Sequence, residues 1–228
     1  MKTSFFLGLI AAVFLPVAQY GIWQYAPQEL VMGEVQRIFY MHLPLAWWAL
    51  LAFFLVFVLS IRVLLRPRHH LDILALSFAE IGVLFTSLTL ITGSIWARAA
   101  WNTWWTWDPR LTTALIMWFI YVAYLVLRRA GFGGEKQMRV SAVLGVIAFL
   151  DVPLVFFSAR FWRSIHPAVF STQGTGLDQR MLLTLCVSIL AVGCLFLALV
   201  LVRWKQLLLA AGVERMFGDI VSRSCDDE

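Results

Sequence analysis

The chain has 228 residues, of which 61% are hydrophobic and 14% are charged, whereas a soluble domain carries about 25% charged residues. The mean hydropathy of +0.83 indicates apolar surface that requires lipid, which excludes an ordinary soluble domain. A net charge of +5 would suit nucleic acid, but the placement of the cations decides their role. Because that placement follows a membrane topology, we expect the lipid bilayer as a partner and no nucleic acid.

Six apolar stretches are long enough for helices of ~20 residues that cross a bilayer. They cover about residues 5–23, 43–65, 73–95, 111–127, 140–157 and 181–202. The loops are short and no internal repeat is evident, so we expect one domain over residues 1–228. The sequence therefore predicts an all-α polytopic membrane protein with six transmembrane helices.

The first stretch has an alternative interpretation as a cleaved secretory signal, because Lys2 precedes an apolar run. Pro16-Val17-Ala18 is a poor cleavage site, and the run reaches the length of a full span. We therefore expect this segment to be retained as a transmembrane helix. At the other end, residues 203–218 could form an amphipathic helix at the membrane surface.

The distribution of cations predicts the orientation, because cytoplasmic loops collect Lys and Arg. With both termini inside, the inner segments hold 12 Lys and Arg residues and the outer segments hold six. We therefore expect both termini in the cytoplasm and the loop at residues 96–112 outside. The outer cations are Arg37, Arg98, Arg110, Arg160, Arg163 and Arg180. They need an anionic partner, either lipid headgroups or a ligand.

Three cysteines without a C-x-x-C pair exclude several kinds of site. These are a disulfide scaffold, a zinc ribbon, a thioredoxin-type dithiol and a covalent haem attachment site. Cys186 and Cys194 lie in one apolar run and are interpreted as small core residues.

The tryptophans are distributed unevenly between the two sides of the membrane. A plain interfacial belt would place them on both sides, yet nine of the 11 lie on or near the predicted outer side. These are Trp23, Trp47, Trp48, Trp96, Trp101, Trp104, Trp105, Trp107 and Trp162. This imbalance indicates a site on the outer face rather than two belts.

The densest stretch is the outer loop at residues 96–112, W-A-R-A-A-W-N-T-W-W-T-W-D-P-R-L-T. If this stretch is helical, Trp101, Trp104, Trp105 and Asp108 fall on one stripe at i, i+3, i+4 and i+7. Such a stripe would form a flat platform for a large planar apolar ligand. The alternative is a re-entrant segment whose rings rest among the lipid headgroups.

Charged residues at this loop have both a ligand-binding and a structural interpretation. Arg98 and Arg110 flank the aromatic residues and suit carboxylates, so a planar ligand with carboxylate edges, such as haem with its propionates, matches the loop. Asp108 followed by Pro109 resembles an N-cap with proline in the first helical position. Capping of the fourth span and a role at the ligand are compatible.

Two histidines are predicted on the same outer face, although they are far apart in the sequence. His42 precedes the second span and His166 follows the fifth. Imidazole nitrogen is a common axial ligand of haem iron, so the pair could hold iron from opposite sides; the alternative is that each is an ordinary interfacial side chain. His69 and His70 lie in an inner basic loop and are interpreted as solvated.

Two carboxylates, Glu80 and Asp151, lie within predicted spans, where ionisable groups are costly and are functional by default. The sequence offers neither an obvious partner. They could contact one another, cap a helix disturbed by Pro153, or line a pathway.

The segment W-N-T-W-W-T-W-D-P-R-L-T resembles the tryptophan-rich W-W-D motif of the haem-handling protein superfamily, and within it the CcmC family of cytochrome c maturation. I-F-Y-M-H-L-P-L-A-W-W, with His42, is similar to that family's first histidine motif. V-P-L-V-F-F-S-A-R-F-W-R-S-I-H-P, with His166, is similar to its second. The family often has glycine where this chain has Ala97 and Asn102, and the residues after the second histidine are shortened here to Pro167-Ala168.

The resemblance implies that b-type haem binds non-covalently at the periplasmic face of the bacterial inner membrane, with His42 and His166 as iron ligands. Trp101, Trp104, Trp105, Trp107 and Asp108 would form the loop surface, with Arg98 and Arg110 beside it. The implied partners are the haem chaperone CcmE, which forms a covalent bond to haem, the ABC-type subunits CcmA and CcmB, and the small membrane protein CcmD. This would make the chain a haem delivery component rather than an enzyme.

Three other functions compete with haem delivery. A membrane haem b electron-transfer subunit usually ligates haem from within its spans, whereas His42 and His166 lie at an edge. A small-molecule transporter using Glu80 and Asp151 would leave the outer tryptophans unexplained. The larger haem lyases share the W-W-D motif but generally have more spans.

Overall fold

The computed structural model describes residues 2–129, 134–161 and 177–226, and every regular element within them is a helix. The elements are α1 (Lys2–Tyr20), the π-helical turn η1 (Gly21–Tyr25), the 3-10 turn η2 (Glu34–Ile38), α2 (Phe39–Leu65), α3 (His69–Trp101), α4 (Pro109–Arg129), α5 (Gly134–Ala148), α6 (Asp151–Phe161) and α7 (Gln179–Asp226). Six helical segments of the described residues are long and apolar enough to cross a membrane, at Lys2–Tyr25, Glu34–Leu65, His69–Trp101, Pro109–Arg129, Gly134–Ser158 and Gln179–Phe217. The prediction of an all-α polytopic membrane protein is confirmed.

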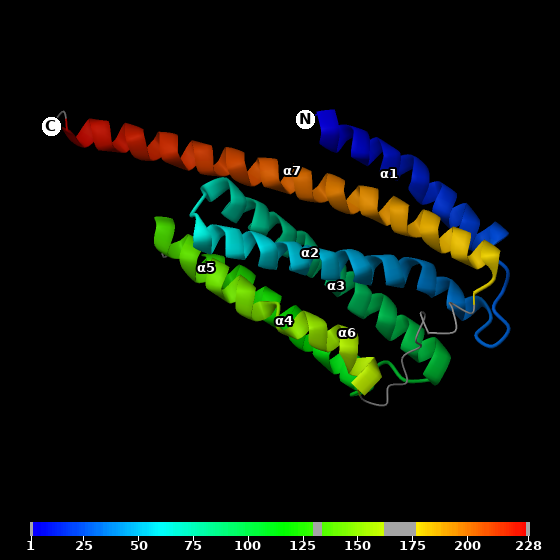
Figure 1. Ribbon diagram of the computed structural model, residues 1–228. Coiled ribbons are helices and arrows are strands. Elements are labelled where there is room, and N and C mark those ends of the chain that lie inside the picture. Colours follow the sequence, from blue (N-terminus) through cyan, green and yellow to red (C-terminus); the bar gives the residue numbers. More distant parts are fainter. Residues whose placement is uncertain (1, 130–133, 162–176, 227–228) are drawn as a thin grey trace.

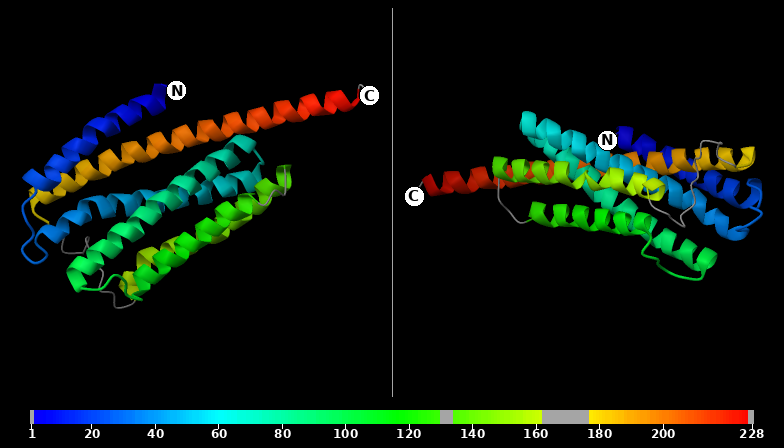
Figure 2. Two further views of the ribbon diagram at one scale, coloured as in Figure 1. Left: turned by 180° about the vertical axis from the view of Figure 1, so that it is seen from behind. Right: turned by 60° about the horizontal axis from the view of Figure 1, so that its bottom comes forward.

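The helices form three layers (Figure 1). The α2–α3 pair lies in the middle, α1 packs along α7 on one side, and α4, α5 and α6 cover the other side. The reverse view shows the same order of layers (Figure 2, left). Because α2 contacts α3, α5, α6 and α7, its position determines where residues near its N-terminus, such as His42, are held.

Glycines on three neighbouring helices allow close approach to α2. They are Gly82 of α3, Gly145 of α5 and Gly193 of α7, which lie against Phe53, Ser60 and Trp48 of α2, respectively. A methyl group added at any of them would collide with the α2 side chain unless that side chain moved. Small residues at helix interfaces are typical of membrane bundles, where close packing drives association.

The fifth span is broken into two helices, α5 and α6. The α5 helix ends at Ala148, and tight backbone hydrogen bonds from Leu150 to Ile147 and from Val152 to Phe149, of 3.0 and 3.1 Å, precede and begin α6. Pro153 explains the break, because a proline ring clashes with the carbonyl four residues earlier and its nitrogen donates no hydrogen bond. Asp151 is the first residue of α6 and is buried.

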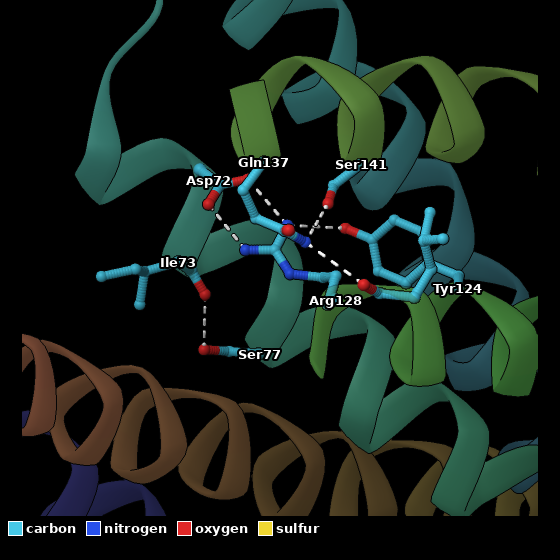
Figure 3. A network of polar contacts seen from close by, with 8 residues as sticks. Asp72, Ile73, Ser77, Tyr124, Arg128, Gln137 and Ser141 are labelled. Atoms are coloured by element: carbon cyan, nitrogen blue, oxygen red, sulfur yellow. Dashed lines mark hydrogen bonds and ion pairs between the residues drawn. The ribbon is translucent and has the colours of Figure 1, made fainter. Parts of the chain in front are cut away.

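A buried polar network joins α3, α4 and α5 at the end of the bundle that carries His69 (Figure 3). Arg128 of α4 donates hydrogen bonds of 2.7 and 2.6 Å to the two carboxylate oxygens of Asp72 of α3, and a third of 3.2 Å to the Tyr124 hydroxyl. Gln137 of α5 donates to the Leu127 carbonyl of α4 at 3.4 Å. The Asp72 and Arg128 side chains are both 7% exposed. Each charge is therefore stabilised by the opposite charge of its partner rather than by water.

The structure supplies a partner for Glu80 that the sequence did not reveal. Arg203 of α7 forms an ion pair with Glu80, with a distance of 2.9 Å from Nη2 to Oε1. Glu80 therefore pairs with α7 and not with Asp151. The α7 helix continues as one element through Gln179–Asp226, so residues 203–218 prolong the helix of the last span.

Candidate functional site

A cavity of about 130 Å³ opens where α2, α3, α4 and α6 meet the loop that follows α3. Most of its lining is apolar, and the side chains that carry chemistry are His42, Trp96, Trp101, Trp105 and Arg110. These five residues come from two segments, α2 and the 96–112 region, which are remote in the sequence. The packing of α3 against α2 brings the two together.

His42 lies in the first turn of α2 and is 8% exposed. Its Nδ1 lies 3.0 Å from the Thr92 hydroxyl of α3. The ring meets Trp96 edge to face, with centroids 5.8 Å apart. A methyl group at Gly93 would lie only 3.1 Å from the imidazole Cε1. Two adjacent turns of α3 therefore hold the imidazole at the cavity wall.

The tryptophan-rich segment is not one helix. The α3 helix ends at Trp101, and Asn102 takes a left-handed conformation with φ 56° and ψ 23°. Arg98 supports this end by donating a 2.7 Å hydrogen bond to the Asn102 carbonyl. The stripe along Trp101, Trp104, Trp105 and Asp108 depended on a continuous helix, and the described loop does not form one.

The loop instead divides its tryptophans between two faces. Trp101 and Trp105 line the cavity, whereas Trp104 and Trp107 are 60% and 77% exposed. The Arg98 guanidinium lies over the Trp104 ring at 5.9 Å, and Trp107 meets the edge of Trp105 with centroids 6.1 Å apart. One face of the loop thus closes the cavity and the other faces outward.

Asp108 caps α4, as its position before Pro109 predicted. Its Oδ1 accepts a 2.9 Å hydrogen bond from the Arg110 backbone N–H, and its carbonyl accepts one of 2.9 Å from Thr112. The cap fixes the first turn of α4, which directs the Arg110 side chain to the cavity wall. Asp108 therefore acts on the site through the backbone, and Arg110 is the cation that reaches it.

Apart from Asp108, which caps α4, the predicted site residues fall into three groups. His42, Trp101, Trp105 and Arg110 meet at one cavity. Arg98, Trp104 and Trp107 lie on the outward face of the loop. His166 lies outside the described residues, together with Trp162 and Arg163.

His42 is contacted by Thr92, Gly93 and Trp96. The sequence alone did not assign these three residues to the site. Trp96 was counted among the outer tryptophans, and its place at the start of the tryptophan-rich stretch was the available signal. Thr92 and Gly93 gave no signal, because their role depends on the packing of α3 against α2. The buried Trp105 Nε1 also has no hydrogen-bond partner among the described residues, so a ligand could supply an acceptor.

The geometry combines an imidazole, a cation and aromatic walls in one small cavity, which suits a planar apolar ligand with an acidic edge and a metal.

Comparison with known proteins identifies the family of the chain. A family model described as "Heme exporter protein C" matches residues 1–217.

Individual relatives agree with this match over most of their length. The heme exporter protein C of Bradyrhizobium diazoefficiens is 32% identical over 94% of this chain and 83% of the relative. That of Escherichia coli K12 is 30% identical over 89% of this chain and 82% of the relative. A putative cytochrome c biosynthesis ccmC-like mitochondrial protein of Marchantia polymorpha is 35% identical over 72% of this chain and 69% of the relative. The chain therefore belongs to the heme exporter protein C family.

Proposed function

We propose that this protein binds b-type haem non-covalently at the periplasmic face of the bacterial inner membrane and delivers it to the haem chaperone CcmE for cytochrome c maturation. Membership of the heme exporter protein C family supports a role in haem handling. The observation that carries the proposal is the meeting of His42, Trp101, Trp105 and Arg110 at one cavity.

The chemistry of these residues fits haem. Imidazole is a common axial ligand of haem iron, and the indole rings offer flat apolar surfaces to a porphyrin. Arginine pairs well with carboxylates, so Arg110 is our candidate for a propionate. The buried Trp105 N–H, which lacks a hydrogen-bond partner among the described residues, would gain an acceptor.

The size of the cavity favours presentation of the ligand over its enclosure. Pockets for small molecules and cofactors usually measure about 300–1,000 Å³, whereas the described walls enclose about 130 Å³. Haem bound here would rest partly outside these walls. We propose that His166, which lies outside the described residues, supplies the second iron ligand.

The outward face of the loop is our candidate surface for the chaperone. Trp104 and Trp107 are largely exposed, and tryptophan is enriched at the centres of protein interfaces. We further propose that the chain acts as a single membrane domain beside the ABC-type subunits CcmA and CcmB and the small membrane protein CcmD. The covalent bond to haem would form on CcmE, so this chain would deliver haem without being an enzyme.

The test is an absorption spectrum of the protein purified in detergent, with and without CcmE. Wild type is expected to show a haem Soret band, which His42→Ala and His166→Ala each reduce at least several-fold. His70→Ala, at the opposite end of α3, is the matched control and is expected to retain the band. If wild type never copurifies with haem and both site variants still support c-type cytochrome formation, the ligand assignment is wrong.

The same preparation separates delivery from electron transfer. A delivery protein is expected to pass haem to CcmE and to show no quinol-dependent reduction of the bound haem. Reduction by a quinol at a catalytic rate, without transfer to CcmE, would instead establish the electron-transfer function.

A further inference from the structure

The contact between His42 Nδ1 and the Thr92 hydroxyl indicates which nitrogen of the imidazole ring carries the proton. We propose that Thr92 is a positioning residue that fixes His42 in the tautomer protonated at Nδ1, so that Nε2 carries the lone pair that binds metal. This inference rests on the proposed function only where it concerns iron, because the tautomer is a property of the protein without ligand.

The argument begins with the single proton of the Thr92 hydroxyl. Its Oγ1 lies 2.8 Å from the Leu88 carbonyl oxygen and 3.2 Å from the Thr89 carbonyl oxygen. Both carbonyls are acceptors only, so the hydroxyl donates its proton to them. The remaining close contact of Oγ1, at 3.0 Å from His42 Nδ1, then requires the imidazole to donate.

Neighbouring residues of α3 support this direction of the Thr92 hydroxyl. Ser77, Thr86, Ser87 and Thr89 each donate a hydrogen bond of 2.8 or 2.9 Å to the carbonyl four residues earlier. Such back-bonding is the common behaviour of hydroxyl residues within a helix. In a membrane-spanning segment there is little water to compete for the hydroxyl proton.

The surroundings of the imidazole also fix its orientation. Rotation of the ring by 180° about the Cβ–Cγ bond would exchange Nδ1 for a carbon and break the contact with Thr92. Gly93 leaves just enough space for the ring, since an added methyl group would lie 3.1 Å from Cε1 and 3.6 Å from Nδ1. Trp96 meets the ring edge to face. Thr92 therefore selects both the orientation and the tautomer.

The chemical nature of the acceptor has a consequence for ligand strength. Histidines that bind metals usually donate their other N–H to a carboxylate, a backbone carbonyl or water, and this partner raises the basicity of the ligating nitrogen. A neutral hydroxyl raises it less than a carboxylate would. Thr92 thus gives His42 a defined geometry with a moderate metal bond, which suits a protein that must release its cargo.

The direct test uses protein free of haem, labelled with ¹⁵N at histidine. His42→Gln identifies the His42 signals by their loss. Wild type is expected to show a protonated Nδ1 and an unprotonated Nε2 for His42, and Thr92→Ser is expected to keep this pattern. Thr92→Val, which has almost the same shape without the hydroxyl, is expected to shift the population toward protonated Nε2.

Thr113→Val is the matched control, because Thr113 also donates to the carbonyl four residues earlier, Pro109, at 2.8 Å, but lies on α4. It is expected to leave the His42 signals unchanged. Protonated Nε2 in wild type would overturn the inference, as would a Thr92→Val spectrum identical to that of wild type.

The haem-loaded protein gives a second readout that is independent of delivery. Loss of a partner of a metal-binding histidine typically weakens metal binding by about 10–100-fold. Thr92→Val is expected to weaken haem binding about 10-fold and to shift the Fe–N(His) stretching band in resonance Raman spectra, whereas Thr92→Ser stays within about twofold. Failure of wild type to bind haem would refute the proposed function and leave the tautomer result standing.

Discussion

Asn102 is the residue that turns the chain out of α3 and into the tryptophan-rich loop. Among the described residues it is the one non-glycine residue with a positive φ. Asparagine enters the left-handed region more readily than most residues with a Cβ. Asparagine can therefore make this turn although it has a Cβ.

Substitutions at Asn102 test this backbone requirement. Asn102→Gly is expected to change the free energy of unfolding by less than about 0.5 kcal/mol, whereas Asn102→Val is expected to cost about 1–2 kcal/mol because of its clash in the left-handed region. Thermal unfolding in detergent measures both. Ala99→Val, on an exposed helical position of α3, is the control. Equal stability of the Gly and Val variants would contradict the requirement.

Local chemistry made some residues of the site predictable, and long-range packing hid others. The Asp108 cap could be predicted because it depends on residues one to four positions away. The outward direction of Trp104 could not, because it follows from the end of α3 at Trp101. Thr92 lies 50 residues from His42, and nothing in either local sequence indicates the contact.

At the level of whole helices, two ion pairs connect spans for which the sequence indicated no contact. Asp72 joins α3 to α4 through Arg128, and Glu80 joins α3 to α7 through Arg203. The apolar runs predicted the spans themselves, since length and hydropathy are properties of each segment. The pairs could not be predicted, because the partners are 56 and 123 residues apart.

The buried pair of Asp72 and Arg128 is expected to matter more than an exposed pair. Arg128→Met leaves the Asp72 carboxylate buried without its partner, which typically costs about 3–5 kcal/mol. A double variant, Asp72→Leu with Arg128→Met, is expected to regain most of that loss. Thermal unfolding in detergent provides the comparison.

The control for this pair is Arg139→Ala. Arg139 and Glu135 are 63% and 57% exposed in their ion pair, so the loss is expected to stay below about 1 kcal/mol. A double variant as unstable as Arg128→Met would show that the lost stability comes from packing rather than from the unpaired charge.

For the whole molecule, the number of spans and the cation bias together predict the topology. The described helices bear out the six spans, while the orientation remains a prediction from the 12:6 division of the cations. Hydropathy and charge are summed over many residues, so an error of a few residues in a span limit changes neither the number of spans nor the predicted orientation. The order of the three layers depends on packing between spans, which these sums do not describe.

Reporter fusions test the orientation. Alkaline phosphatase, which is active only outside the cytoplasm, is expected to be active when fused after Val31 and inactive when fused after Arg68, on opposite sides of α2. A green fluorescent protein fused after Glu228 is expected to fluoresce, because both termini are predicted in the cytoplasm. Active phosphatase after Arg68 would reverse the assignment and place the tryptophan-rich loop inside.

The glycine contacts around α2 also shape how this chain can change over evolutionary time. Gly82, Gly145 and Gly193 face side chains of α2 so closely that a mutation to any larger residue must displace those side chains or the helix that carries them. Because α2 carries His42, such a mutation would also shift the His42 imidazole relative to the cavity that it lines. Random mutagenesis is therefore expected to yield inactive variants at these glycines, although none of the three lines the cavity.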